Sequence, residues 1–223
     1  MSAIRVGLAD DQPLFRAGIR MILDSQDDIE VVWEASDGAE AIHSAGERPV
    51  DLILMDVEMP GVDGVEATTR ILASAPPADG RQTRVVVLTT FELNDKTFKA
   101  IQAGASGFLL KNADPEFLLA SIRTVHSGSA VIAPSVMTGL VERFARKTTR
   151  IDTDALAELT TRERDIFSLI VGGLSNNEIA LERHVSDATV KSHVSRILGK
   201  LELRDRVQLV IYAYENGLVT PEE

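Results

Sequence analysis

The sequence contains no cysteine, which excludes disulfide bonds and thiolate chemistry and is typical of a reducing compartment. It also has no apolar run near the ~18–20 residues that a membrane-spanning helix needs. The first residues, MSAIRVGLADD, reach an acidic pair too soon for a secretion signal. These absences predict a cytoplasmic protein without membrane insertion.

Positive charge is also scarce, with 23 lysines and arginines against 34 acidic residues and a net charge of −11. This balance argues against a chain that coats nucleic acid non-specifically. The excess acid lies mostly in residues 1–135, which hold 11 basic and 20 acidic residues, against 12 and 14 in residues 136–223. If the second part binds nucleic acid, its basic residues must gather on one face.

The first part of the chain alternates short apolar runs with helix-like stretches. The runs, several of them β-branched as in buried parallel strands, are 4–9, 29–35, 50–56, 84–90 and 106–110. The helix-like stretches are 14–24, 38–46, 63–75, 95–103 and 115–127. Five such repeats predict an α/β domain over residues 1–127, with a doubly wound five-stranded parallel sheet and helices on both faces.

The second part is predicted to be all-α. Residues 128–158 are expected to form a linker with a short helical patch near 135–146. From residue 159 the chain predicts four helices, and their expected start signals are capping boxes at Thr160–Glu163 and Ser175–Glu178 and N-caps at Ser186 and Asp205. A short second helix, a tight turn and a third helix are typical of a helix-turn-helix domain, here residues 159–223.

Acidic residues mark the ends of two predicted strands. Asp10 and Asp11 follow the first strand, and Asp56 ends the third. Ligands of an open parallel sheet bind beyond the carboxyl ends of its strands, so these carboxylates are expected to meet there and need a cation such as Mg²⁺. Thr89, at the end of the fourth strand, offers a hydroxyl, and Lys111, after the fifth, offers a positive charge that suits a phosphoryl group. Solvated loop carboxylates are the plain alternative for any one of these acids, but the five positions together favour a site.

These residues resemble the receiver domain of two-component response regulators over about residues 3–127. The resemblance rests on Asp10-Asp11, on Asp56 within MDVEMPGVDG, on Thr89, and on Lys111 within GFLLK. It implies that Asp56 accepts a phosphoryl group from a sensor histidine kinase. It also implies a flavodoxin-like fold.

The same resemblance implies roles for the surrounding residues. The implied Mg²⁺ ligands are Asp10 (mostly through water), Asp11, Asp56 and the backbone carbonyl of Glu58. Thr89 and Phe108 match the switch pair, in which the hydroxyl moves to the phosphoryl group and the ring rotates inward, and Lys111 binds the phosphoryl group. Pro60 and Gly64 either shape the loop after the nucleophile or serve turn chemistry alone. Gln12 and Asn112 depart from the residues common at their positions, and neither departure removes a reacting group.

The predicted third helix of the second part has two faces. Val190, Val194, Ile197, Leu198 and Leu201 recur at helical spacing and are expected in the core. The remaining face carries three positive charges beside hydroxylated residues, which suits phosphate and base-edge contacts. A solvated surface helix is the alternative for this face.

Residues 159–219 resemble the LuxR-type DNA-binding domain of NarL/FixJ response regulators, through LTTRERDIFSLIVGGLSNNEIALERHVSDATVKSHVSRILGKLELRDR. The resemblance implies that Lys191 contacts a base. The full implied DNA-contacting set is Asn176, Asn177, Thr189, Val190, Lys191, His193, Arg196 and Lys200. An ordinary exposed polar residue is the alternative for His193. Arg183 stands where the family usually has leucine, with Leu181 off the expected core face, so Arg183 is expected to snorkel or the helix end to shift. The fourth helix is expected to supply core residues and to take part in dimerisation.

The sequence therefore predicts a two-component response regulator and transcription factor. Phosphorylation of Asp56 is expected to control homodimerisation and specific binding to double-stranded promoter DNA. One alternative is a metabolic enzyme, an aspartate-nucleophile phosphatase or phosphotransferase, but Glu58 replaces the second aspartate that such a phosphatase would carry. We therefore predict that the protein accepts a phosphoryl group and is not a metabolic enzyme. The other alternative is a DNA-binding protein whose receiver fold only dimerises.

Overall fold

The structure is a computed structural model that describes residues 3–74, 83–90, 95–128, 131–132, 155–203 and 205–218. The chain divides into two compact units, Met1–Met137 and Thr138–Glu223. Most of the predicted linker, including the helical patch near 135–146, lies outside the described residues. The proposed domain boundaries therefore stay a prediction.

The first unit alternates strands and helices as expected. Its strands are β1 (Ile4–Ala9), β2 (Ile29–Ala35), β3 (Leu52–Asp56), β4 (Arg84–Thr89), β5 (Gly107–Leu110) and β6 (Val131–Ile132). Its helices are α1 (Pro13–Asp24), α2 (Gly38–Glu47), α3 (Gly64–Ala73), α4 (Asp95–Gln102) and α5 (Pro115–His126).

The strands form one parallel sheet in the order β2-β1-β3-β4-β5-β6. Chain order reverses at β1, which lies between β2 and β3, so the carboxyl ends of β1 and β3 flank a topological switch point. The register pairs Ala9 with Met55, which places Asp10 and Asp56, the residues next along the chain, side by side. This confirms the doubly wound α/β fold and puts a crevice where the sequence predicted one.

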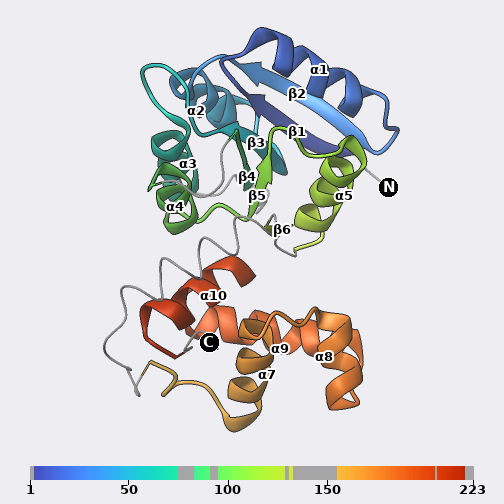
Figure 1. Ribbon diagram of the computed structural model, residues 1–223, viewed down its shortest axis with the longest axis vertical. Coiled ribbons are helices and arrows are strands. Elements are labelled where there is room, and N and C mark those ends of the chain that lie inside the picture. The colour runs from blue at the N-terminus through green and yellow to red at the C-terminus, as the bar shows by residue number, and fades with distance from the viewer. Residues whose placement is uncertain are drawn as a thin grey trace. The chain divides into compact units, whose positions relative to one another are not determined.

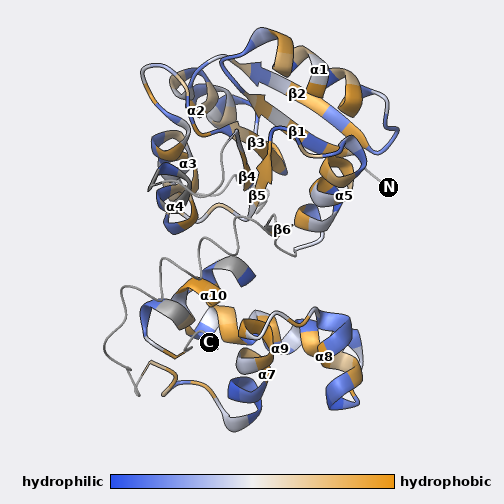
Figure 2. Ribbon diagram, in the orientation of Figure 1, coloured by the Kyte–Doolittle hydropathy of each residue, from blue (hydrophilic) through white to orange (hydrophobic). Residues whose placement is uncertain are grey.

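Helices cover both faces of this sheet (Figure 1). The first core cluster joins β-strand residues to α1 and α5, through Ile19 and Leu23 of α1 and Leu118 and Ile122 of α5. On the other face α2 contacts α3 and α3 contacts α4. The hydrophobic colouring concentrates along the inner strands (Figure 2), because strands buried on both faces are apolar throughout.

The side chain of Trp33, the single tryptophan, requires a glycine at position 7 of β1. Trp33 of β2 is buried, and its indole Nε1 donates to the carbonyl of Arg48 over 3.1 Å. A Cβ on Gly7 of β1 would lie only 2.2 Å from the Trp33 ring. A side chain at Gly7 is therefore excluded by the ring packed against it.

The sixth strand was not predicted. Val131 pairs with Gly107 of β5 and Ile132 pairs with Phe108, which extends the sheet within the predicted linker. A strand of two residues is too short to show the alternation of apolar and polar side chains by which a strand is recognised in a sequence. The backbone groups on the outer edge of β5 supply its partners.

The second unit contains four described helices, as predicted. They are α7 (Thr161–Val171), α8 (Asn176–Arg183), α9 (Asp187–Lys200) and α10 (Arg206–Glu215). Both predicted capping boxes form, with Thr160 and Ser175 as N-caps, and Ser186 caps α9. The core gathers residues from all four helices, among them Ile166, Ile179, Ile197 and Leu209.

Candidate functional site

Three carboxylates meet at the switch point of the sheet. Asp10 and Asp11 follow β1, and Asp56 is the last residue of β3. One ligand oxygen from each lies within 4.8 Å of the others. Asp10 and Asp56 are buried, at 0% and 3% exposed, whereas Asp11 faces solvent. The structure thus brings together the three acids that the sequence singled out.

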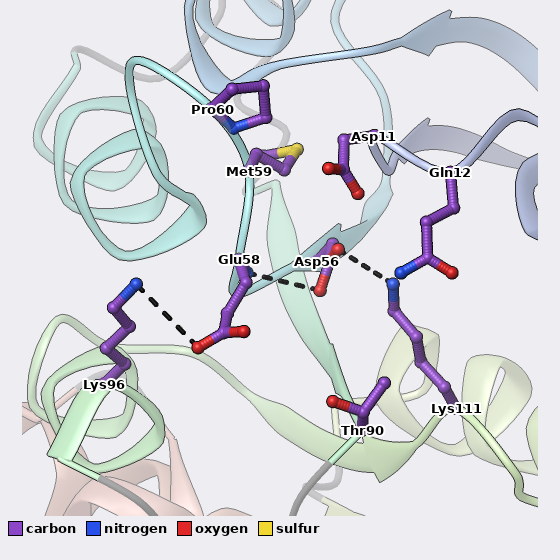
Figure 3. A pocket seen from close by; sticks show the side chains of 9 residues that line it. All are labelled: Asp11, Gln12, Asp56, Glu58, Met59, Pro60, Thr90, Lys96 and Lys111. Carbon is purple, nitrogen blue, oxygen red and sulfur yellow. Dashed lines mark hydrogen bonds and ion pairs between the residues drawn. The ribbon is translucent and has the colours of Figure 1, made fainter.

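Lys111 is the buried lysine beside these acids (Figure 3). Its Nζ lies 2.7 Å from Asp10 Oδ2 and 2.8 Å from Asp56 Oδ2, with the side chain almost fully buried. The backbone N–H of Lys111 donates to the carbonyl of Thr89 over 2.7 Å, which fixes the loop that carries it. Burial alone lowers the pKa of Lys111, but the two carboxylates outweigh that effect and raise it, so the side chain stays charged.

The negative charge of the Asp56 carboxylate is only partly compensated by its neighbours. Burial raises its pKa, and the hydrogen bond and charge of Lys111 offset only part of that effect. The one further hydrogen bond described for its carboxylate, from the backbone N–H of Glu58, is long at 3.3 Å. The anionic form of Asp56 is therefore less stabilised than that of an ordinary surface aspartate.

The acidic cluster fits a divalent cation. Two buried carboxylates share one lysine, and a third acid lies beside them. Oxygen ligands are those that Mg²⁺ takes, and such a charge would relieve the repulsion among the three acids. The donor set of Asp10, Asp11 and Asp56 therefore could bind Mg²⁺.

The two residues of the predicted switch pair lie on neighbouring strands. Thr89 ends β4 and is buried. Phe108 of β5 pairs with Val87, two residues before Thr89, so both side chains lie on one face of the sheet. The Phe108 ring is fully buried, the inward arrangement that the resemblance describes. Their roles as a switch stay predictions.

Gly64 lets α3 start directly against the end of β3. Its N–H donates to the Val57 carbonyl over 3.1 Å, and a Cβ at this position would lie 1.8 Å from the carbonyl oxygen of Asp56. Any side chain would push apart the loop that carries Asp56. Pro60 lines the same pocket, and its role in shaping this loop stays a prediction.

Some residues of the pocket were not singled out from the sequence. Lys96, in the first turn of α4, lies 3.9 Å from the carboxylate of Glu58 across the mouth of the pocket (Figure 3). Thr90 and Met59 line the same cavity of about 420 Å³. The available signal was the position of Lys96 at the start of the helix after β4, on the same edge of the sheet.

Two residues from the first turn of α1 also reach this pocket. The Phe15 ring centroid lies 4.8 Å from Lys111 Nζ. The guanidinium of Arg16 donates from Nη1 to the Asp10 carbonyl over 2.5 Å and from Nε to Glu34 over 3.2 Å. No sequence signal marked either residue, because both act through tertiary contacts.

The predicted DNA-contacting residues lie on α8 and α9 and differ in exposure. Those exposed to solvent are Asn177, Thr189, Lys191 and Arg196. Those half-buried are Asn176, His193 and Lys200. The ammonium of Lys191, 62% exposed, lies 2.9 Å from Asp187 one turn earlier, a weak pair that a phosphate or base can displace.

Val190 is not a DNA contact, and that expectation was wrong. Its side chain is 0% exposed and belongs to the core cluster of the second unit. Helical spacing places it with Ile197 on the inward face of α9, so no atom of its side chain is available to a groove. The same spacing correctly placed Val190 and Ile197 in the core.

Lys200 is held inside the unit by a buried acid. Its Nζ lies 2.6 Å from Oε2 of Glu163, which is only 4% exposed. The same oxygen accepts hydrogen bonds from the backbone N–H and the hydroxyl of Thr160, both at 2.9 Å. The bond from Lys200 and those from Thr160 lower the pKa of Glu163 from 4.5 to about 2. Lys200 therefore joins α9 to the start of α7.

Asn176 is hydrogen-bonded within the second unit, whereas one nitrogen of His193 is buried there without a partner in the described part of the chain. Oδ1 of Asn176 accepts from Nη1 of Arg206 over 3.4 Å, which links the start of α8 to α10. The Nδ1 atom of His193 is buried and has no hydrogen-bond partner among the described groups.

Arg183, which stands where leucine was expected, is the last residue of α8. The helix ends at Arg183, and His184 follows it with a φ of 55°. Arg183 is half-buried while Leu181 is 77% exposed, as expected from its position off the core face. The polar side chain thus reaches solvent from a position beside the core.

None of the helices in the described part of the chain combines the length and apolar character needed to cross a bilayer. The pocket and the four-helix unit together define a class of protein, a receiver joined to a DNA-binding helix-turn-helix. Two family models agree with that class. The response regulator receiver domain matches residues 6–123, and the luxR family of bacterial regulatory proteins matches residues 157–213.

Known proteins resemble the chain over nearly its whole length. It is 41% identical to an uncharacterized transcriptional regulatory protein, YxjL of Bacillus subtilis, over 97% of each chain. It is 40% identical to the response regulator protein VraR of Staphylococcus aureus, over 97% of this chain and 99% of the other. The crystal structure of the response regulator ChrA, from a heme-sensing two-component system, matches with a TM-score of 0.52 and 36% identity, over 98% of this chain and 100% of that chain. The chain belongs to the two-component response regulators with a LuxR-type DNA-binding domain, and it regulates transcription.

Proposed function

We propose that Asp56 is the phosphoacceptor and that its phosphorylation by a sensor histidine kinase controls DNA binding by the second unit. The observation that carries this proposal is the geometry of the pocket. Three acids lie within 4.8 Å of one another, and Lys111 lies 2.8 Å from Asp56. The carboxylate of Asp56 is buried, and its negative charge is only partly compensated. These properties suit a nucleophile that acts together with a metal ion.

The reaction is a direct phosphoryl transfer. A carboxylate oxygen of Asp56 forms the bond to phosphorus while the bond from phosphorus to the kinase histidine nitrogen breaks. Mg²⁺, when bound by Asp10, Asp11, Asp56 and the carbonyl of Glu58, supplies charge neutralisation for this step. Lys111 balances the charge of the transferred group, and Thr89 with Phe108 reports its presence to the rest of the unit. The protein is a phosphoacceptor and not a metabolic enzyme.

The output is specific binding to double-stranded promoter DNA. The exposed residues of α8 and α9, led by Lys191 and Arg196, provide base and phosphate contacts. Phosphorylation favours a homodimer that presents two helix-turn-helix units to two half-sites. Because this target is chromosomal promoter DNA, the protein acts in the cytoplasm.

The test uses the full chain, Mg²⁺ and acetyl phosphate as a small phosphodonor. Intact-mass spectrometry is expected to show one added phosphoryl group on the wild-type protein and none on Asp56→Asn, which lacks the carboxylate nucleophile. Binding to promoter DNA is expected to strengthen only in the labelled wild-type protein. Equal labelling of Asp56→Asn, or labelling without a change in DNA affinity, overturns the proposal.

A further inference from the structure

The ammonium group of Lys111 contacts two carboxylates and one aromatic ring. Asp10 and Asp56 approach its ammonium group at 2.7 and 2.8 Å. The ammonium group also lies over the ring of Phe15, with 4.8 Å between Nζ and the ring centroid. Separations below ~6 Å from a ring face are those at which a cation is attracted by the aromatic quadrupole.

The ring is held in a fixed place. Phe15 stands in the first turn of α1 and is partly buried against the core cluster of the first unit. The next residue, Arg16, ties that turn to the pocket through the Asp10 carbonyl and to β2 through Glu34. The ring face therefore has a defined position relative to the loop that carries the acids.

The ring contact differs from the carboxylate contacts in what happens during phosphoryl transfer. Asp56 becomes an acyl phosphate whose negative charge lies on the phosphoryl oxygens, and the charge of Asp10 is shared with a metal ion in the proposed mechanism. The two carboxylate contacts that hold Lys111 in this structure therefore both change. Phe15 takes no part in that chemistry, and its attraction for a cation remains. A buried ammonium that has lost hydration gains more from such a contact than an exposed one.

We propose that Phe15 is a positioning residue for phosphoryl transfer, whose ring face holds Lys111 Nζ where the phosphoryl group of Asp56 needs a cation. This inference rests on the proposed role of Asp56. In this proposal α1 not only packs against the sheet but also holds the ring that positions Lys111. Simple packing of the ring predicts dependence on its shape alone, whereas positioning through the ring face predicts dependence on its electrons.

The experiment replaces Phe15 in the full chain by phenylalanines that carry one, two or three ring fluorines. These residues nearly keep the shape of the ring and progressively remove negative charge from its face. Beryllofluoride, a phosphoryl mimic, is titrated at saturating Mg²⁺ and followed by amide chemical shifts. Its affinity is expected to fall stepwise, by about 2- to 30-fold for the trifluorinated ring.

A matched series at Phe117 of α5, which is 41% exposed and does not line the pocket, is the control and is expected to show no trend. Phe15→Tyr is expected to retain near wild-type affinity, and Phe15→Leu to lose it while still folding as judged by thermal melting. A flat series at Phe15, with wild-type protein that binds beryllofluoride, overturns the role of Phe15 alone. Failure of the wild-type protein to bind beryllofluoride or to be labelled overturns the proposed function as well.

Discussion

Asp56 of the first unit and Glu163 of the second are both buried acids paired with a lysine, yet their environments have opposite effects. Asp56 is 3% exposed and Glu163 4%, and their lysines lie at 2.8 and 2.6 Å. Burial raises the pKa of Asp56, whereas Lys200 and Thr160 lower the pKa of Glu163 to about 2.

The difference lies in how many donors each carboxylate receives. Glu163 has a lysine of its own and two bonds from Thr160, so its charge is fully compensated and the pair joins two helices. Asp56 shares Lys111 with Asp10 and receives one long bond from a backbone N–H. A buried acid–lysine pair alone therefore says little about reactivity, whereas an incompletely compensated acid beside other acids indicates a site for a metal and a phosphoryl group.

The largest effect is expected from removing the shared cation. Lys111→Ala leaves two buried carboxylates without a bound cation and should lower the free energy of unfolding by about 3–5 kcal/mol in EDTA. Millimolar Mg²⁺ should recover part of that loss, because the acids then have a cation again. Urea denaturation with and without Mg²⁺ measures both effects. Lys96→Ala, at the exposed mouth of the pocket, is the control and should change stability little. A loss that is the same with and without Mg²⁺ would contradict the idea of an incompletely compensated pocket.

A smaller effect is expected in the core of the second unit. Val190→Ala removes two buried methyl groups and should lower the free energy of unfolding by about 2–3 kcal/mol. DNA affinity should stay near that of the wild type at temperatures where the variant remains folded, because the side chain does not reach the surface. Thermal melting and DNA binding at low temperature check the two halves of this prediction. Normal stability with lost affinity would restore Val190 as a DNA contact.

Lys191, the neighbour of Val190 in α9, should behave in the opposite way. Lys191→Ala is expected to weaken specific DNA binding by about 1–3 kcal/mol with no loss of stability, because the side chain is exposed. Fluorescence anisotropy with specific and random duplexes measures this change. Equal losses on both duplexes would show that Lys191 contacts phosphate and not a base.

The smallest effect concerns pH, and the two acids should respond with opposite signs. Folding lowers the pKa of Glu163 from 4.5 to about 2, so the stabilisation from this group is present above pH 4.5 and is lost as pH falls toward 2. Lys200→Met should therefore lower the melting temperature near pH 7 by a few degrees, and the difference should shrink across that window. Lys200 is one-third exposed, so solvent screens the pair and limits the effect.

Folding raises the pKa of Asp56 above 3.8, so without Mg²⁺ this group favours the unfolded state once pH rises through that raised value. Asp56→Asn should consequently stabilise the Mg²⁺-free protein at neutral pH and leave it unchanged in strong acid. Circular dichroism melts across pH test both variants. The same sign for both would remove the distinction between the two acids.

Much of the fold follows from sequence patterns because burial imposes them. The run at 4–9 is β1 itself, and the capping boxes at Thr160 and Ser175 form as expected, since each signal lies within a few residues. β6 was missed because two residues carry no periodicity. The fourth helix was expected to supply core residues, and on α10 those buried most completely among the described side chains are Leu209 and Ala213. Neighbouring helices, and not spacing alone, decide which face is covered.

The site was predictable where it lies at strand ends and not where it depends on tertiary contacts. Asp10, Asp11 and Asp56 were expected together because parallel strands end at one edge. The pair of Lys200 with Glu163 joins residues 37 apart, so no local pattern reveals it. Phe15 and Lys96 reach the pocket from helices whose packing determines where their side chains point.

The tryptophan packed against Gly7 has a practical consequence for all these measurements. Trp33 is the only tryptophan of the chain, and both tyrosines, Tyr212 and Tyr214, lie on α10 of the other unit. Selective excitation of the indole therefore reports the first unit alone, and tyrosine emission reports the second. The native chain carries a separate optical label on each of its two units, so the unfolding of one can be followed beside that of the other without any added dye.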